Sequence, residues 1–167
     1  MIYLLDANFF IQSHRDNYPL DVVVSFWGKF KEISEKGIVI SIDKIYNELN
    51  SDPKNPDALS QWCTNNLPKN FFKPTDGAIA QYQDVVGWAQ SRSGHYTSAA
   101  ITEFLSTTEA DAFLVAYAMK YREVKIVTKE SSNPNMKNRI KLPEPCDAFG
   151  IQYCNLITMF REINERF

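Results

Sequence analysis

The beginning of the chain constrains the fold most, because four apolar residues there are followed directly by a carboxylate. Residues Ile2 to Leu5 have the sequence Ile-Tyr-Leu-Leu, and Asp6, Ala7 and Asn8 come next. A short, continuous apolar run is typical of a strand that is buried on both faces, as in a parallel sheet. Asp6 would then stand at the carboxyl end of that strand, which is the edge where open α/β sheets bind ligands.

The rest of the chain alternates between helix-like and strand-like segments, which predicts a parallel sheet built from right-handed crossovers. Its 167 residues contain no internal repeat or linker, so we expect one domain over 1–167. Gly37 is expected to end the second helical segment. The expected segments are a loop at 9–20, a helix capped by Asp21 and reaching Lys36, a strand at 38–40, a helix capped by Ser41, helices near 56–65, 76–92 and 98–105, a helix from Thr108 to Tyr121, a strand at 124–127, a loop at 131–145, a strand within 147–153, and a helix over 156–167.

Composition excludes several classes of protein. With 44% hydrophobic and 13% aromatic residues the chain is expected to be globular rather than disordered. It has no apolar run near ~18 residues and no basic n-region, so we expect neither a membrane span nor a signal peptide, and a cytoplasmic location. Its three cysteines form no C-x-x-C pair, which favours reduced thiols. The usual nucleotide-cofactor and serine-hydrolase motifs are missing.

The charges are unevenly distributed along the chain. The net charge is −2, yet residues 120–141 carry seven bases and two acids, a local balance of +5, so the remainder carries −7. A basic segment on an acidic body attracts phosphate groups. The alternative is a solvated loop with scattered lysines.

Two acids follow predicted strands. Asp6 follows the first strand, and Glu130 comes shortly after the strand at 124–127. Acids at the carboxyl ends of parallel strands can face one crevice. Asn8 would support Asp6 by hydrogen bonding to its carboxylate or to water. The alternatives are that Asp6 only caps or turns the chain and that Glu130 is a loop acid neutralised by Lys129.

Two further acids lie on predicted helices. Glu48 is at the rim of the helix that follows the second strand, where most glutamates are merely solvated. Asp111 shares a helical stripe with Leu114, Val115 and Ala118, so its charge points towards the sheet and needs a partner there. Its alternative is a capping-box role with Thr108. Glu109 lies nearly opposite on the same helix and is the weaker candidate.

Together the four acids predict a metal site. Asp6, Glu48, Asp111 and Glu130 would supply only oxygen ligands, which suit Mg²⁺ or Mn²⁺ and disfavour zinc. Two such ions can activate water and stabilise the leaving oxygen in phosphodiester hydrolysis.

Three motifs resemble those of the PIN domain, the fold of VapC-like toxin ribonucleases. They are Leu4-Leu5-Asp6-Ala7-Asn8, Tyr46-Asn47-Glu48-Leu49, and the run from Ala110 to Ala118, followed by Ile126-Val127-Thr128. Phe26-Trp27, a long helical insertion between Glu48 and Asp111, Lys141-Leu-Pro and Cys146-Asp-Ala-Phe-Gly150 are similar to a poorly characterised bacterial and archaeal PIN-like subgroup. The resemblance implies a three-layer fold with four to five short parallel strands flanked by helices.

The same resemblance implies a function. Asp6, Glu48 and Asp111 would be metal-binding catalytic acids, with Glu130 as the fourth where the family usually has Asp, and Asn8 and Thr128 would support them. The activity would be Mg²⁺- or Mn²⁺-dependent endoribonuclease cleavage, and homodimers and an antitoxin partner are frequent in the family. RNA would cross the basic segment, whose candidate phosphate contacts are Lys129, Lys137, Arg139 and Lys141.

Two other functions are weighed against a nuclease. A PIN module of little catalytic power could bind RNA or a protein partner without cutting. A receiver-like phosphotransfer domain would also place an acid after the first strand, but it needs an adjacent acid pair that Ala7 and Asn8 do not supply.

Overall fold

Five short parallel strands form the centre of the computed structural model, which describes residues 1–106 and 108–166. Their order across the sheet is β3-β2-β1-β4-β5. The protein is thus an α/β protein with a parallel sheet, as the sequence predicted. The strands are β1 (Ile2–Leu5), β2 (Val39–Ile42), β3 (Phe72–Lys73), β4 (Val124–Val127) and β5 (Tyr153–Cys154).

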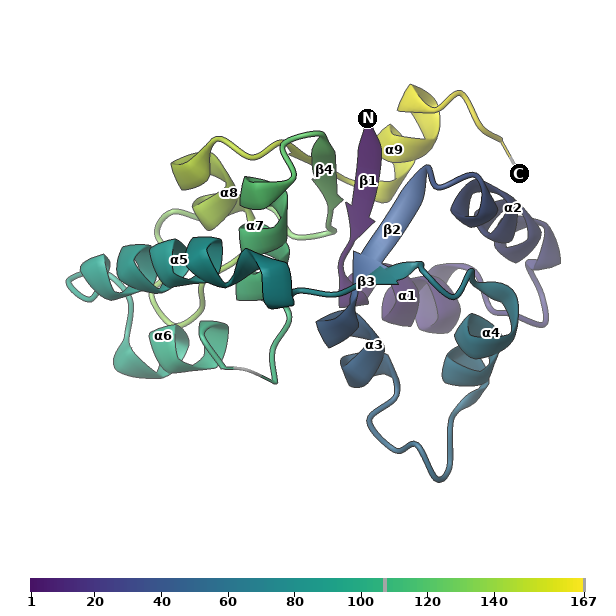
Figure 1. Cartoon of the computed structure of the whole chain (residues 1–167), viewed down its shortest axis with the longest axis horizontal. Helices are drawn as coiled ribbons and strands as arrows, with labels where there is room; N and C mark the ends of the chain where they lie inside the picture. The colour runs from purple at the N-terminus through teal and green to yellow at the C-terminus, as the bar shows by residue number, and fades with distance from the viewer. Residues whose placement is uncertain (107, 167) are drawn as a thin grey trace.

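Helices cover both faces of this sheet, which gives three layers consistent with a PIN-like fold. Figure 1 shows α5 to α8 on one side of the strands and α1, α2 and α4 on the other. In the described part of the chain the helices are α1 (Ala7–Gln12), the π-helix η1 (Ser13–Asn17), α2 (Val24–Glu35), α3 (Asp43–Leu49), α4 (Ala58–Asn66), the 3-10 helix η2 (Asp76–Ala78), α5 (Ile79–Ser91), α6 (Ser98–Phe104), α7 (Asp111–Lys120), α8 (Pro143–Phe149) and α9 (Leu156–Glu162).

The first strand occupies the middle of the sheet because its side chains can be buried on both faces. Leu4 and Leu5 are 0% exposed, and β1 pairs with β2 on one side and with β4 on the other. The pairs Ile2–Val124 and Leu5–Val127 fix the register of β1 against β4. Asp6 and Thr128 therefore leave the sheet side by side.

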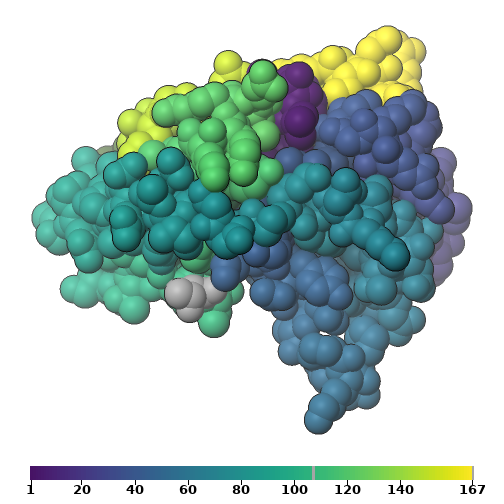
Figure 2. Space-filling view, viewed as in Figure 1, coloured from purple at the N-terminus to yellow at the C-terminus, as the bar shows by residue number. Residues whose placement is uncertain are grey.

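Aromatic side chains of the first two helices form much of the core on one side of the sheet. Phe10, Phe26 and Phe30 are fully buried, and Trp27 packs edge-on against Phe26 with ring centroids 5.2 Å apart. The insertion between Glu48 and Asp111 contains α4, η2, α5 and α6, and it also adds the edge strand β3. The segment between α3 and α4 projects from the body of the molecule (Figure 2).

The prediction of a loop at 9–20 is wrong over residues 9–17. Asp6 caps α1, and the apolar pair Phe9 and Phe10 is buried, so the chain forms α1 and η1 before it becomes irregular. Such a helix of one and a half turns is too short to show a helical period, which is why the pattern did not reveal it.

Several predicted boundaries also differ. Ser41 lies within β2 and donates its hydroxyl to the Leu5 carbonyl, so it does not cap α3. Asp21 does not cap α2, which begins at Val24 and ends, as predicted, before Gly37 with its φ of +68°. The helix predicted from Thr108 starts at Asp111, and α8 begins inside the predicted loop at 131–145. The terminal helix ends at Glu162, and Phe167 lies outside the described residues.

The strand order creates one place where the chain reverses its direction of growth across the sheet. From β1 the chain adds β2 and β3 on one side, and it then adds β4 and β5 on the other. Ligands of open α/β sheets bind at such a point, outside the carboxyl ends of the two strands that flank it. Here these strands are β1 and β4.

None of the helices in the described ranges is long and apolar enough to cross a membrane.

Candidate functional site

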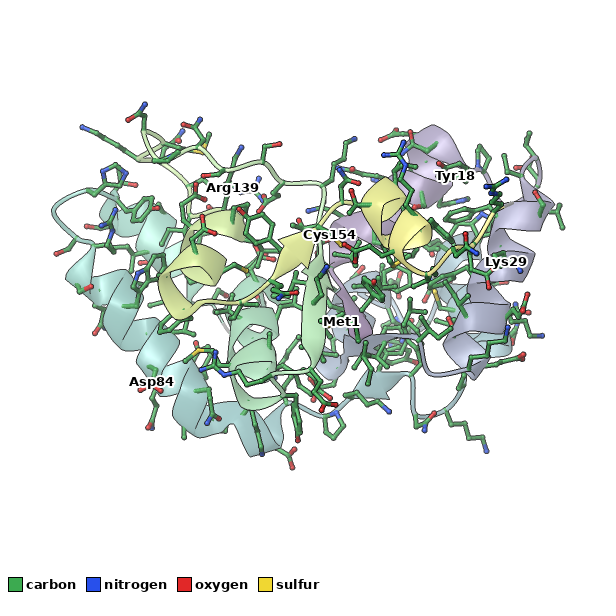
Figure 3. All side chains as sticks on the ribbon, turned by 90° about the horizontal axis from the view of Figure 1, so that it is seen from above. Met1, Tyr18, Lys29, Asp84, Arg139 and Cys154 are labelled. Atoms are coloured by element: carbon green, nitrogen blue, oxygen red, sulfur yellow. The ribbon has the colours of Figure 1, made fainter. Side chains whose placement is uncertain are left out.

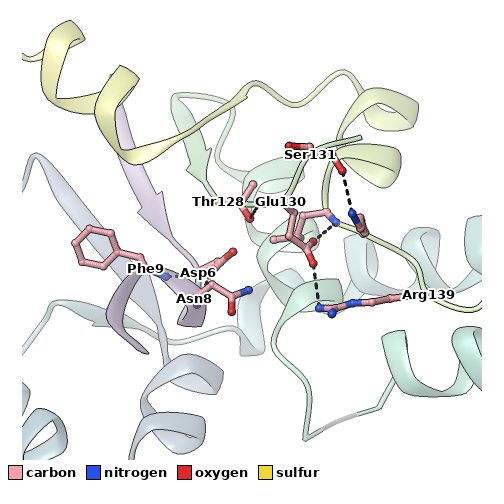
Figure 4. A network of polar contacts seen from close by, with 9 residues as sticks. Asp6, Asn8, Phe9, Thr128, Glu130, Ser131 and Arg139 are labelled. Atoms are coloured by element: carbon pink, nitrogen blue, oxygen red, sulfur yellow. Dashed lines mark hydrogen bonds and ion pairs between the residues drawn. The ribbon is translucent and has the colours of Figure 1, made fainter. Parts of the chain in front are cut away.

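Asp6 is the first residue beyond β1, and it is almost completely buried. Its carboxylate caps α1, where Oδ1 accepts hydrogen bonds from the backbone N–H groups of Asn8 and Phe9, the latter at 3.3 Å (Figure 4). The contact is made by the backbone N–H of Asn8 and not by its side-chain amide, so it corresponds to the capping role that was the alternative for Asp6.

The second carboxylate oxygen of Asp6, Oδ2, lacks such backbone hydrogen bonds. Oδ2 is buried and has no hydrogen bond of standard geometry with the residues that the structure describes, although the hydroxyl of Thr128 is near enough to favour the ionised carboxylate. Burial raises the pKa of Asp6 from 3.8 to about 6, and the charge of Glu130 raises it further, whereas Thr128 and the backbone N–H groups of Asn8 and Phe9 oppose the rise. Asp6 is therefore a buried acid that lacks a positive partner.

Glu48 and Asp111 resemble Asp6 in that their pKa values are raised. Burial raises the pKa of Glu48, on α3, to about 7, and the charges of Glu109 and Asp6 add to this effect. Burial also raises the pKa of Asp111, the first residue of α7, well above its ordinary value. The charges of Asp6, Glu130 and Glu48 act in the same direction on Asp111, and Arg139 opposes them.

Glu130 is close to these acids but has its own partners. Its Oε1 pairs with Arg139 at 3.0 Å, and its Oε2 accepts a hydrogen bond of 2.8 Å from the backbone N–H of Leu142. Its own N–H donates to the hydroxyl of Thr128 at 3.2 Å (Figure 4). Both carboxylate oxygens of Glu130 thus have a partner, whereas only the Oδ1 atom of Asp6 does.

The structure brings the four predicted acids into one electrostatic neighbourhood. They come from β1, α3, α7 and the segment after β4, and each of Asp6, Glu48 and Asp111 is perturbed by at least one of the others. They nevertheless do not form a finished metal centre, since no three His, Cys, Asp or Glu side chains of residues 1–106 and 108–166 are grouped closely enough to hold a metal ion.

Glu109 belongs to this neighbourhood too, although the sequence ranked it as the weaker candidate. It raises the pKa of Glu48, and it lines a small pocket together with Glu103, Asp111 and Arg139. The helical wheel of α7 placed it on the far side, but α7 begins only at Asp111, so Glu109 precedes the helix and does not follow its geometry. A sequence prediction that started this helix at Asp111 would not have placed Glu109 on the far side.

The four predicted phosphate contacts have different surroundings. Arg139 is paired with Glu130, and Lys141 donates a long hydrogen bond of 3.4 Å to the Ser131 carbonyl. Lys129 and Lys137 are exposed, and neither side chain has a hydrogen bond or ion pair within the described part of the protein. Lys129, Lys137 and Lys141 therefore have no acidic partner among the described residues, and Lys129 and Lys137 are the exposed ones of the three.

Comparison with known proteins gives one result. No curated protein and no solved structure matches the chain. A family model described as a domain of unknown function, DUF4411, matches residues 3–167. Because this match covers nearly the whole chain, the protein belongs to the DUF4411 family.

Proposed function

We propose that this protein is a metal-dependent endoribonuclease whose active site lies beyond the carboxyl ends of β1 and β4. The observation that carries the proposal is the group of acids around Asp6, which is buried, whereas Glu48 and Asp111 are half-buried. The base that acts on Asp111, Arg139, is already paired with Glu130. Buried carboxylates raise the free energy of the folded protein unless something compensates them. Acids with strongly perturbed pKa values in a crevice are typical of functional sites.

A hard divalent cation fits this donor set. The unpartnered Oδ2 atom of Asp6 is a free oxygen ligand, and Asp111 and Glu48 would add carboxylates of the same kind. Glu130 would join the set only by giving up Arg139, and it is therefore proposed as a supporting ligand.

The protein's own residues would bind and orient the substrate. A bound Mg²⁺ or Mn²⁺ would lower the pKa of a coordinated water, and it would bring positive charge close to the phosphate. Thr128, beside Asp6, favours the ionised form of that carboxylate. Lys129 follows immediately and is free to contact an RNA phosphate, with Lys137 as a second candidate.

Cleavage of single-stranded RNA with Mn²⁺ tests the proposal in the variants Asp6→Asn and Asp111→Asn. Asparagine keeps the cap of α1 because Asn and Asp are equally good N-caps. Each variant should lose activity by ~10²-fold or more, and its melting temperature should not fall. Asp84→Asn is the matched control, since Asp84 lies on the outer side of α5 (Figure 3). Unchanged cleavage in both site variants would reject the assignment.

A second candidate, an RNA- or protein-binding module without catalytic power, is favoured by one observation. Glu130 is engaged by Arg139 and Leu142, and the described acids form no ready-made metal group. Calorimetric titration with Mn²⁺ separates the two candidates. Heat of binding that disappears in Asp6→Asn supports the nuclease, whereas RNA binding without any Mn²⁺ heat supports the module.

The biological setting is part of the same proposal. A toxin role, an antitoxin partner, a homodimer and a cytoplasmic location are supported by the resemblance to PIN-domain ribonucleases. Co-expression toxicity in a bacterial host that depends on Asp6 would test the toxin role directly.

A further inference from the structure

A cavity of about 260 Å³ adjoins the acids, between the first helices and the ends of β4 and β5. We call it the amide pocket because four side-chain amides line it, those of Asn8, Gln12, Asn17 and Asn155. Thr128 also lines it, which places the cavity directly beside Asp6. The π-helix η1 supplies part of its wall, and π-helical turns occur frequently at functional sites.

The polar groups of the amide pocket are incompletely satisfied. The Oε1 atom of Gln12 is buried and has no hydrogen-bond partner among the described residues. The Oδ1 atom of Asn155 caps α9 by accepting from the Thr158 N–H at 2.8 Å, so its NH₂ group is the part left for a ligand. A buried acceptor without a donor costs free energy, and rotation of the Gln12 side chain towards a bound ligand that donates a hydrogen bond would remove this cost.

These groups match the chemistry of a nucleobase. The amides of Asn8, Gln12 and Asn17 each carry a donor and an acceptor, as the edges of the bases do, and Asn155 adds a donor. Phe9 and Tyr18 also line the cavity, although the ring of Phe9 packs mainly in the core and the ring of Tyr18 stacks on Phe26. Proteins read single-stranded RNA by placing splayed bases against aromatic rings and by hydrogen bonding to the base edges. A cavity of this size is smaller than a drug-sized pocket, which suits one base rather than an entire dinucleotide.

Lys129 relates the amide pocket to the RNA backbone. A second cavity, of about 360 Å³, shares Thr128, Lys129 and Asn155 with the first and extends to Glu130. The exposed charge of Lys129 thus stands between two cavities at the edge of the sheet. This is the arrangement that successive nucleotides of a single strand require, with the cation at the phosphate that joins them.

We propose that the amide pocket binds one base of single-stranded RNA, next to the phosphate that Lys129 contacts, and selects the position of cleavage. The inference rests on the proposed ribonuclease function and adds base specificity to it. Gln12 and Asn155 would be the specificity-determining residues.

The first experiment measures base preference. A pool of RNA strands randomised around a central position is cleaved with Mn²⁺, and the products are sequenced. The wild type should prefer one base at a fixed position by roughly tenfold, and Gln12→Met and Asn155→Ser should abolish that preference. Serine retains the cap of α9. Gln83→Met, on the exposed face of α5, is the matched control and should keep the preference.

The second experiment detects binding without cleavage. The four nucleoside 5′-monophosphates are titrated separately into the protein, and the backbone amide NMR signals are followed. One of them should shift the signals of residues lining the amide pocket, with an affinity that falls roughly tenfold in Gln12→Met.

The two experiments separate the two proposals. Mononucleotide binding in the pocket without cleavage of any RNA would support the base site and reject the nuclease. Cleavage without base preference, together with no mononucleotide shift at the pocket, would support the nuclease and overturn the base site. A preference that persists unchanged in both pocket variants would likewise overturn it.

Discussion

Asp6 has two opposing effects on the free energy of folding. Its Oδ1 atom stabilises α1 by accepting hydrogen bonds from the first turn, whereas its Oδ2 atom is buried without a partner. A residue that served only as a cap would be better placed at the surface. Burial of this acid in its ionised form therefore lowers the stability of the folded protein, and a cation bound there, as proposed above, would offset this cost.

This conflict predicts an unusual dependence of stability on pH. In the unfolded chain Asp6 ionises near its ordinary pKa of 3.8, whereas in the folded protein it does so near 6. Between these values the folded state holds the extra proton, so stability falls as pH rises and the full penalty is present above about 6. That penalty corresponds to about 3 kcal/mol. Glu48 extends the fall towards pH 7.

Urea unfolding between pH 4 and 8, in the presence of EDTA, measures this effect. Asp6→Asn should have a flatter pH profile and should be more stable than the wild type at pH 7. Asp84→Asn, which alters an exposed acid, should follow the wild-type profile. An Asp6→Asn protein that is less stable at pH 7 would show that the ionised carboxylate has a partner in solution.

At the scale of single residues, the sequence located acids better than it described their surroundings. Asp6 and Asp111 were noticed because each stands where an apolar strand or stripe meets a charge, whereas Glu48, at the rim of its helix, was assigned a role through the resemblance to PIN domains. The functional role of all three stays a prediction. The pairing of Glu130 with Arg139 was not recognisable, because it depends on how the segment between β4 and α8 folds back. The same applies to the Gln12 oxygen, because the burial of this atom without a partner depends on how α1 and η1 pack.

At the scale of elements, a contact between β1 and β2 lies just beyond their last backbone pair and next to the candidate site. Their paired residues are Tyr3 with Val39 and Leu4 with Ile40. One step further, the Ser41 hydroxyl donates a 2.7 Å hydrogen bond to the Leu5 carbonyl, immediately before Asp6. This contact fixes the strand end from which the carboxylate projects.

Ser41→Ala should therefore destabilise the protein by ~1 kcal/mol or more, because it removes a fully buried hydrogen bond between two strands. Ser34→Ala is a matched control. Ser34 is also buried, but its hydroxyl only adds a bond to the Phe30 carbonyl within α2, so its loss should cost less. Thermal unfolding of the two variants measures the difference. Equal losses would contradict a special role for the link between the strands.

The elements that were predicted well are those with long or purely apolar patterns. The strand at 124–127 and the apolar helix that reaches Lys120 were found because each buries nearly every side chain. Three short elements, β3, α1 and α8, were missed or misplaced. Their formation depends on a capping acid, on edge pairing with β2, or on Pro143 at the start of a helix, and none of these produces a period.

For the molecule as a whole, residues 120–141 present less positive charge at the surface than the sequence suggested. Several bases of residues 120–141 are used internally. Lys125 pairs with Glu162 on α9, Arg139 pairs with Glu130, and Arg122 donates to the Phe149 carbonyl. These contacts tie the last helices to the sheet. The attraction for a polyanion therefore rests on few residues, chiefly Lys129 and Lys137.

The dependence of RNA binding on salt measures how many of these charges contact phosphate. In EDTA and with the Asp6→Asn background to prevent cleavage, the logarithm of affinity for a single strand should fall with the logarithm of salt concentration by ~0.7 for each phosphate neutralised. Lys129→Ala should reduce that slope by about this amount, and Lys137→Ala should do so if the RNA path continues past α6. Lys54→Ala, in the projecting loop between α3 and α4, should leave the slope unchanged. An unaltered slope in Lys129→Ala would place the RNA backbone away from the end of β4, and hence away from the acids that are proposed to cut it.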